Sequence, residues 1–308
     1  MNAIEVRNLT RRFGAFVAVK DLTFDVRQGE IFGFLGSNGA GKSTTIRMLC
    51  GLLRSSAGHA TVGGIDVGKS PEAVKRRIGY MSQRFSLYEK LTVDQNIAFF
   101  GGIYGLSRQR LADRREFVLE MAGLRGREAT LTGALSAGWR QRLALGCAIL
   151  HEPPIVFLDE PTGGVDPLSR RRFWDLISDL ASRGTTVLVT THYMDEAEHC
   201  NRVAIIQAGQ LAALGTVAEL KQIFAGRPIL EVRASQPVDV MRRLDAMLEV
   251  EKTSVFGTAV HAVLRSNGSM PRQVGDRLTA SGVAAKWAVV DPSLEDVFLE
   301  VAERVAPQ

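Results

Sequence analysis

Eight consecutive residues near the amino terminus combine closely spaced glycines with a lysine and a hydroxyl side chain. From Gly36 to Ser43 they read Gly-Ser-Asn-Gly-Ala-Gly-Lys-Ser, which fits the pattern G-x-x-x-x-G-K-[ST] at every fixed position. An apolar run at 31–35 predicts a buried strand before them, and 44–49 predict a helix directly after them. The free N–H groups of such a loop, together with the helix N-terminus, favour a bound polyanion.

This phosphate-binding loop predicts a site for a nucleoside triphosphate. We expect Lys42 to reach the β- and γ-phosphates and the Ser43 hydroxyl to coordinate Mg²⁺. An ordinary glycine-rich turn before a helix would not need every position of the pattern in register. The loop residues expected to contact the nucleotide are Gly36, Ser37, Asn38, Gly39, Ala40, Gly41, Lys42, Ser43 and Thr44.

A second candidate site lies at the end of a continuously apolar run. Residues 155–158, Ile-Val-Phe-Leu, are followed directly by Asp159 and Glu160. A strand that is apolar at every position is typical of a sheet covered on both faces, and such sheets bind ligands beyond the carboxyl ends of their strands. We therefore expect Asp159 to bind Mg²⁺ directly or through a ligand of the metal. We expect Glu160 to act as the general base that orients and deprotonates the attacking water.

Length and composition narrow the class of protein. The 308 residues allow one large or two modest domains, and 45% hydrophobic residues suit a globular core. A net charge of +5 is too small to choose between an anionic membrane surface and nucleic acid. Cys50, Cys147 and Cys200 form no C-x-x-C pair, which argues for a reducing compartment and against a disulfide framework or a zinc site.

The sequence also predicts where the protein works. No run approaches the roughly 18–20 apolar residues that a membrane-spanning helix needs. The first residues lack the basic and apolar segments of a signal peptide. We expect a cytoplasmic protein that reaches a membrane only through a partner.

Alternating strand-like and helix-like segments predict an α/β cassette over residues 1–224, with a largely parallel sheet. Mixed short strands over 10–26 favour an antiparallel flap. The expected strands are 4–8, 23–27, 31–35, 155–158, 185–190 and 203–207. Besides the helix after the loop, the expected helices are 108–121, 139–150 and 168–182.

Gly and Pro near 224–228 mark a break, so we expect a separate accessory domain over 225–308. Its segments predict the order β-α-β-β-α-β, which is typical of a small ferredoxin-like α+β domain. The expected strands and helices are 229–233, 238–248, 252–256, 259–265, 272–280 and 284–290. A last amphipathic helix at 294–302 carries an apolar stripe that is more typical of packing than of membrane binding.

Further short motifs stand in order around the two candidate sites. Over roughly the first two-thirds of the chain they resemble the ATP-binding cassette (ABC) ATPases, which are P-loop NTPases with a mixed sheet and a helical subdomain. By this resemblance Gln83 is the Q-loop glutamine and Leu-Ser-Ala-Gly-Trp at 135–139 is the LSGGQ signature. Gly-Gly-Val-Asp at 163–166 is the D-loop, His192 is the switch histidine, and Phe13 is the aromatic residue that stacks on adenine.

The resemblance implies a Mg²⁺-dependent ATPase in which two copies face each other head to tail and enclose ATP. The implied catalytic residues are Lys42, Gln83, Glu160 and His192. The implied Mg²⁺ ligands are Ser43, Gln83 and Asp159. The opposite copy would offer Ser136 and the Gly138 N–H to the γ-phosphate, and Asp166 of the D-loop is also counted with the nucleotide-binding residues.

Some positions depart from the family pattern. Ala137 replaces a glycine and Trp139 replaces the glutamine of the signature, while Ser136 and Gly138 are present. We therefore expect both sites of a homodimer to be active. Phe13 stands where tyrosine is commoner and can still stack, and the D-loop differs from the usual Ser-Ala-Leu-Asp.

Three segments resemble drug-exporter ATPases of the daunorubicin-resistance type. They are His-Glu-Pro-Pro at 151–154, Pro-Thr-Gly-Gly-Val-Asp-Pro at 161–167, and Asp-Pro-Ser-Leu-Glu-Asp-Val-Phe-Leu at 291–299. This resemblance implies a subunit that powers a membrane exporter of multidrug or other hydrophobic cargo. Its partner would be a separate polytopic permease, which holds the chain on the cytoplasmic face of the membrane.

The segment 83–106 is the expected permease-facing surface, although its apolar residues suit the core of the helical subdomain equally well. These residues are Phe85, Leu87, Tyr88, Phe99 and Phe100. The alternative function is a soluble ABC ATPase that acts on ribosomes or nucleic acid. Such proteins usually carry two cassettes or long coiled coils, which this sequence lacks, so no nucleic-acid partner is expected. An importer ATPase is disfavoured because its C-terminal domain is often larger and barrel-like.

Overall fold

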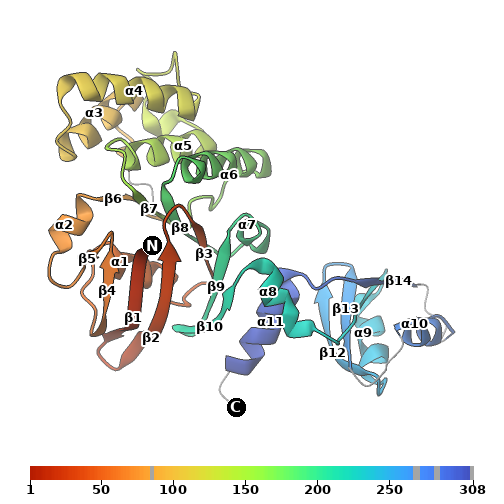
Figure 1. The fold of residues 1–308 in the computed structure, drawn as a ribbon. Coiled ribbons are helices and arrows are strands. Elements are labelled where there is room, and N and C mark those ends of the chain that lie inside the picture. Colours follow the sequence, from red (N-terminus) through yellow and green to blue (C-terminus); the bar gives the residue numbers. More distant parts are fainter. Residues whose placement is uncertain (84–86, 266–270, 281–284, 306–308) are drawn as a thin grey trace. The chain divides into compact units, whose positions relative to one another are not determined.

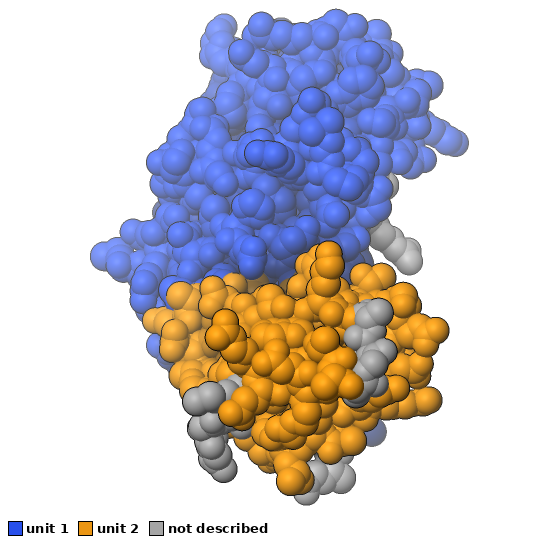
Figure 2. Space-filling model, turned by 90° about the vertical axis from the view of Figure 1, so that its right-hand side faces the viewer, with its two compact units in different colours: residues 1–217, 301–308 blue, residues 218–300 orange. Residues whose placement is uncertain are grey.

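The computed structural model describes residues 1–83, 87–265, 271–280 and 285–305. The chain forms two compact units, coloured separately in Figure 2. The first comprises Met1–Val217 and Val301–Gln308, and the second comprises Ala218–Glu300. The division into functional domains at 224/225 stays a prediction.

A sheet of six strands forms the centre of the first unit (Figure 1). Its order is β10 (Gln210–Gly215), β9 (Arg202–Gln207), β3 (Ile31–Leu35), β8 (Thr186–Thr191), β7 (Ile155–Asp159) and β6 (Ile78–Met81). All neighbours pair in parallel except β9 and β10. Every residue of β3, β7 and β8 is buried, as the apolar runs at 31–35 and 155–158 predict for β3 and β7.

A second, antiparallel sheet confirms the expected flap, but its strands are longer than predicted. Its order is β2 (Phe16–Arg27), β1 (Asn2–Phe13), β4 (Ala57–Val62) and β5 (Ile65–Asp66). Several register shifts interrupt the pairing of β1 with β2, and Asn8 and Asp21 adopt positive φ values. These irregularities break the alternation of apolar and polar residues, so the pattern indicates only fragments of each strand.

Helices flank the sheets of the first unit, and the predicted ones are present within a few residues. They are α1 (Lys42–Leu49), α2 (Pro71–Lys75), α3 (Val93–Ile103), α4 (Arg108–Ala122), η1 (Thr132–Ala134), α5 (Ala137–Ala148), α6 (Pro167–Ser182) and α7 (Met194–Ala197). Figure 1 shows α3, α4 and α5 gathered beyond one end of the parallel sheet. Side-chain caps begin three of them, because Thr92, Ser107 and Asp166 each accept a hydrogen bond from a first-turn backbone N–H.

An aromatic cluster joins the two sheets and fixes the strand that leads into the phosphate-binding loop. Phe24 of β2 stacks on Phe32 of β3 with ring centroids 5.5 Å apart, and Phe34 lies 5.2 Å from Phe24. All three rings are buried. Burial of such rings contributes about 2–3 kcal/mol each, so the end of β3 is held in a rigid core.

The second unit contains the four-stranded antiparallel sheet β12 (Val250–Phe256), β13 (Ala259–Leu264), β11 (Ile229–Ala234) and β14 (Ala285–Val290). Its helical segments are η2 (Gln222–Phe224), α9 (Pro237–Asp245) and α10 (Pro271–Ala280). Both α8 (Val217–Lys221) and α11 (Leu294–Val305) contain residues of both units. The predicted order β-α-β-β-α-β is therefore confirmed, while the assignment to the ferredoxin-like folds stays a prediction. Across the described residues, no helix has the length and hydrophobicity for a bilayer crossing.

A buried histidine links the sheet of the second unit to the first turn of α11. His261 Nδ1 lies 2.9 Å from Asp296 Oδ1, and its Nε2 lies 3.4 Å from Glu231 Oε2. Glu231 is the direct cross-strand neighbour of His261, and it also pairs with Arg233. Burial alone would lower the pKa of His261, but the hydrogen bonds and charges of Asp296 and Glu231 outweigh it and raise the pKa.

We predict that this histidine makes stability depend on pH. A raised folded-state pKa means that protonated His261 stabilises the fold at low pH, and that this contribution disappears as pH rises through the folded-state pKa. His261→Gln should cost about 1–3 kcal/mol near pH 6 and clearly less near pH 8.5. Urea unfolding of the full chain across this range checks it, with the exposed His59→Gln as the control. A cost that is constant with pH would contradict the prediction.

Candidate active site

The phosphate-binding loop connects β3 to α1 at the carboxyl edge of the parallel sheet. Two of its glycines are required by close backbone approach. A Cβ on Gly36 would lie 2.5 Å from the carbonyl oxygen of Ile206. Gly41 has a φ of +102°, and its Cβ would lie 2.7 Å from the carbonyl oxygen of Ala18. The backbone therefore wraps tightly at both points, as a loop that surrounds phosphate groups needs.

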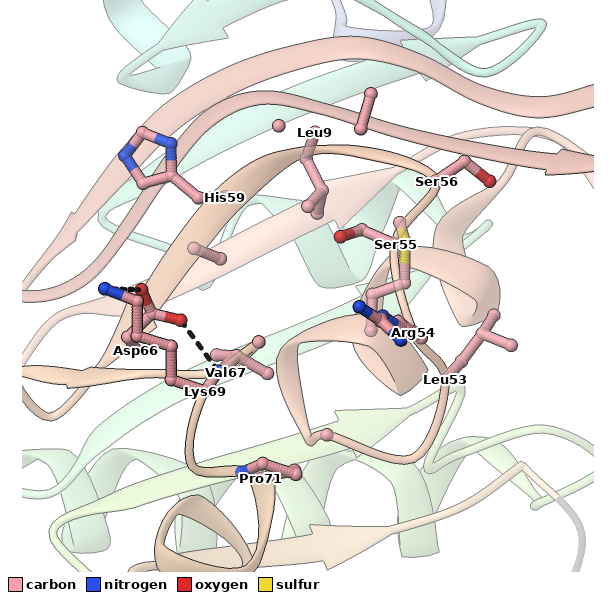
Figure 3. A pocket seen from close by; sticks show the side chains of 16 residues that line it. Leu9, Leu53, Arg54, Ser55, Ser56, His59, Asp66, Val67, Lys69 and Pro71 are labelled. Atoms are coloured by element: carbon pink, nitrogen blue, oxygen red, sulfur yellow. Dashed lines mark hydrogen bonds and ion pairs between the residues drawn. The ribbon is translucent and has the colours of Figure 1, made fainter.

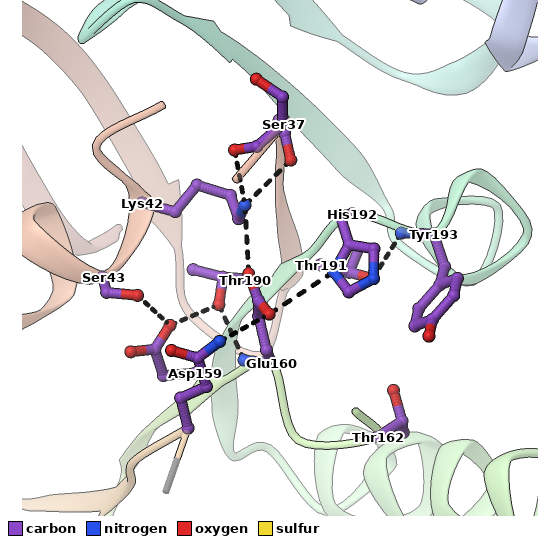
Figure 4. A network of polar contacts seen from close by, with 12 residues as sticks. Ser37, Lys42, Ser43, Asp159, Glu160, Thr162, Thr190, Thr191, His192 and Tyr193 are labelled. Atoms are coloured by element: carbon purple, nitrogen blue, oxygen red, sulfur yellow. Dashed lines mark hydrogen bonds and ion pairs between the residues drawn. The ribbon is translucent and has the colours of Figure 1, made fainter. Parts of the chain in front are cut away.

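The lysine of the loop lies buried over it, with 4% of its surface exposed. Its Nζ donates to the carbonyl oxygens of Gly36, at 2.8 Å, and Ser37, at 3.0 Å. The same ammonium group lies 3.1 Å from Glu160 Oε1 (Figure 4). The positive charge of Lys42 is thus held between the loop and the end of β7.

Asp159, the last residue of β7, is held by two hydroxyl groups. Its Oδ1 accepts hydrogen bonds from Ser43 Oγ at 3.0 Å and from Thr190 Oγ1 at 2.7 Å. Burial raises the pKa of this carboxyl, and the two hydrogen bonds oppose the shift. A carboxylate beside a serine hydroxyl offers the hard oxygen ligands that Mg²⁺ prefers, so this pair fits the metal implied by the sequence.

Glu160 is the point where the predicted catalytic residues meet. Its Oε2 accepts a hydrogen bond from Gln83 Nε2 at 2.9 Å and lies 3.4 Å from His192 Nδ1, while Oε1 faces Lys42. Only 8% of Glu160 is exposed. The structure therefore brings Lys42, Gln83 and His192 around the carboxylate of Glu160. Figure 4 shows Lys42 and His192 on either side of Glu160.

The backbone of Glu160 is strained, with a φ of +47°. Left-handed backbone at a non-glycine residue costs about 1–3 kcal/mol and persists only where surrounding contacts enforce it. Here the Glu160 N–H donates to Thr190 Oγ1 at 2.8 Å, and the same hydroxyl donates to Asp159. Sequence reasoning missed Thr190. Its signal is a pair of hydroxyl residues that follow the apolar residues 187–189 and directly precede His192.

Four predicted nucleotide-binding residues from outside the loop also lie outside this network, as far as the described residues show. Phe13 ends β1 half-exposed, with the Arg11 guanidinium 4.4 Å from its ring centroid. Ser136 and Gly138 lie at the N-terminus of α5. Asp166 caps α6 by accepting from Ser169 N at 2.9 Å, so its carboxylate has a structural role. The nucleotide-binding roles of all four stay predictions.

The predicted permease-facing segment contains both core and surface residues. Leu87 is buried, whereas Tyr88 and Phe99 are exposed and meet edge to face, with ring centroids 4.7 Å apart. The ring of Phe100 packs edge to face on Phe99. Phe85 lies outside the described residues. The aromatic pair Tyr88 and Phe99 is thus accessible to a partner, as is the exposed Ile103 of the same segment.

A cavity of about 670 Å³ opens elsewhere in the first unit, between the end of α1 and strands β4 and β5 (Figure 3). Its wall includes Leu53, Arg54, His59 and Lys69, and Lys69 pairs with the neighbouring Asp66. None of the predicted site residues lines it. The cavity is therefore separate from the Glu160 network.

The geometry agrees with comparisons to known proteins. Residues 19–163 match the family described as ABC transporter. The probable multidrug ABC transporter ATP-binding protein YbhF of Escherichia coli (strain K12) is 50% identical over 218 residues, which are 71% of this chain and 38% of that protein. The daunorubicin/doxorubicin resistance ATP-binding protein DrrA of Streptomyces peucetius is 41% identical over 96% of this chain and 91% of its own length.

A solved dimeric ATP-binding cassette in a post-hydrolysis state, bound to ADP and Pi, superposes with a TM-score of 0.64. It is 25% identical and covers 69% of this chain and 98% of its own. The chain belongs to the ATP-binding proteins of the ABC transporter family, which confirms the resemblance seen in the sequence. It spans only 38% of the length of YbhF.

We predict that Gly36→Ala disrupts the loop. The added Cβ would collide with the backbone of β9, so the variant should lose about 1–3 kcal/mol of stability and at least about tenfold in ATP affinity. Thermal unfolding and binding of a fluorescent ATP analogue measure both. Gly102→Ala is the matched control, because its Cβ meets nothing within 4 Å in α3. Equal ATP affinity in the two variants would contradict the prediction.

Proposed function

We propose that this chain binds ATP with Mg²⁺, hydrolyses it, and powers a membrane exporter of multidrug or other hydrophobic cargo. The convergence of Lys42, Gln83 and His192 on the Glu160 carboxylate is the observation that carries the proposal. Membership of the ABC transporter family and the similarity to drug-resistance ATP-binding proteins support the choice of cargo class.

The residues have complementary roles in this proposal. Lys42 and the loop N–H groups bind the β- and γ-phosphates, while Ser43, Gln83 and Asp159 hold Mg²⁺, which neutralises phosphate charge. Glu160 orients the attacking water and accepts its proton, and His192 contacts the γ-phosphate. Phosphoryl transfer depends mainly on positioning and charge stabilisation, which a buried cluster of charged groups supplies.

The proposed active unit is a head-to-tail homodimer. Ser136 is the N-cap of α5, and the helix N-terminus directs free N–H groups outward, where they favour an anion. A Cβ on Gly138 would lie 2.6 Å from Ser169 Oγ, so glycine allows α5 to approach α6 closely there. This end of α5 would complete the site of the opposite copy.

The proposed permease contact is the aromatic pair Tyr88 and Phe99. Asn96 of α3, which is buried, accepts from the Tyr88 N–H at 2.9 Å and donates to the Tyr88 carbonyl at 3.0 Å. Its amide also donates to Thr132 Oγ1 at 2.9 Å, shortly before the signature segment. A partner bound at Tyr88 could therefore move the signature segment through the hydrogen bonds of Asn96. The chain would lie on the cytoplasmic face of the membrane as a peripheral subunit.

We predict that Glu160→Gln retains ATP binding but loses at least about a hundredfold in turnover, because an amide cannot accept the proton of water. The variant should form an ATP-dependent dimer by size-exclusion chromatography with light scattering. Glu152→Gln is a matched control, because Glu152 also has a positive φ and forms ion pairs. Its partners are Arg110 and Arg114, which are not among the proposed catalytic residues. Turnover within a few-fold of wild type for Glu160→Gln would contradict the base assignment.

We predict that tagged Glu160→Gln protein, with ATP and Mg²⁺, captures a stoichiometric polytopic protein from detergent-solubilised native membranes. Replacing Tyr88 and Phe99 together by Ala in this protein should abolish the capture, and the same two substitutions in the wild-type chain should leave basal ATP turnover unchanged. Leu52→Ala removes an exposed apolar side chain elsewhere and should leave capture intact. Mass spectrometry identifies the partner. Ribosomal proteins or nucleic acid in place of a membrane protein would overturn the exporter function in favour of a soluble ABC ATPase.

A further inference from the structure

A buried carboxylate contacts the residue next to His192 and is not one of the proposed catalytic residues. Glu196 of α7 has 2% of its surface exposed. Its Oε1 accepts a hydrogen bond from Thr162 Oγ1, and its Oε2 accepts one from Thr191 Oγ1 at 2.6 Å. The guanidinium of Arg170, from α6, lies 3.8 Å from Oε1 and balances the charge.

The two threonines belong to the two segments that must meet in the active site. Thr162 follows Glu160 by two positions, and Thr191 directly precedes His192. Thr191 Oγ1 also accepts from the Tyr193 N–H at 3.0 Å, so the residues on both sides of His192 depend on one hydroxyl group. Figure 4 shows this loop facing the segment that carries Glu160 and Thr162.

We propose that Glu196 is a positioning residue for ATP hydrolysis, which fixes the distance between the Glu160 segment and the His192 loop. The inference rests on the proposed function of Glu160 and His192. Glu196 would touch neither nucleotide nor water. It acts by tying both segments to one rigid carboxylate, so that His192 Nδ1 lies 3.4 Å from Glu160 Oε2.

Only a carboxylate satisfies both threonines as they are arranged here. The Thr191 hydroxyl already accepts from Tyr193, so its proton is directed at Glu196. An ionised carboxylate offers an accepting oxygen to each hydroxyl, whereas glutamine has one accepting oxygen and one donating NH₂ group. With glutamine, the Thr162 hydroxyl would have to turn and accept from the NH₂ group, and its own proton would lose the acceptor that Glu196 provides.

The test is steady-state ATP hydrolysis by the full chain, with ATP affinity measured separately. We expect Glu196→Ala to lower kcat at least about tenfold, because misplacement by about 1 Å can cost a hundredfold. The Kd for ATP should change less than about threefold, since no phosphate contact is removed. Glu196→Gln should fall between Glu196→Ala and wild type. An unchanged kcat for Glu196→Ala would overturn the proposal.

A double-mutant cycle separates positioning from general damage to the fold. If Glu196 acts through His192, Glu196→Ala should lower kcat much less in a His192→Ala background than in wild type. Fully additive losses would overturn the proposal. Glu30→Gln is the control for loss of a buried carboxylate, because Glu30 pairs with Arg202 at the amino end of β3. It should lower the melting temperature while leaving kcat within about twofold.

The remaining variants distinguish a folding defect, a failure of the proposed site function and a failure of the positioning role. If Glu196→Ala does not fold, Thr162→Val removes one of the two hydroxyl donors and should still lower kcat about three- to tenfold. A normal kcat for Thr162→Val would then overturn the proposal. If Glu160→Gln and His192→Ala themselves leave kcat unchanged, the proposed function of the site fails. If those two variants are impaired and Glu196→Ala is not, only the positioning role fails.

Discussion

The ion pair between Lys42 and Glu160 is the contact on which the site depends. Both groups are almost fully buried, and an unpaired buried ion costs several kcal/mol. Each charge therefore requires that the other be placed accurately. The loop after β3 places Lys42, and the end of β7 places Glu160. Phosphate groups bound by the loop would compete for the lysine, and Glu160 would then depend on Gln83 and His192. In the proposed function, this exchange of partners would link nucleotide binding to activation of Glu160 as the base.

Strand order explains how distant segments supply one site. β8 lies between β3 and β7, so the carboxyl ends of these three strands present the loop, His192 and the two acids along one edge. The parallel sheet and the place of the acids at a strand end could be predicted from sequence, because the runs at 31–35 and 155–158 are continuously apolar. The order of the strands could not. The fixed spacing of the loop and the paired acids at 159–160 predict nucleotide chemistry at this edge of the sheet.

Other features could not be predicted, for physical reasons. Bulges in β1 and β2 destroy the alternation that marks a strand, and the short strands β4 to β6 are specified by their neighbours. Thr190 and Glu196 make hydrogen bonds to residues 31 and 34 positions away in the sequence. Such contacts leave no periodic pattern in the sequence. The edge where the site forms was predictable, whereas the residues that hold it in place required the fold.

The strained backbone of Glu160 shows why those supporting residues matter. A residue at φ +47° would relax toward an extended or helical conformation unless its N–H and its neighbours were fixed. Thr190 fixes the N–H, while Glu196 and Arg170 restrain the segment that follows. The carboxylate is thereby held in a direction that the local sequence does not favour. Loss of Thr190 or Glu196 would remove this restraint and leave buried polar groups unsatisfied, so the Glu160 carboxylate would move and the fold would lose stability as well.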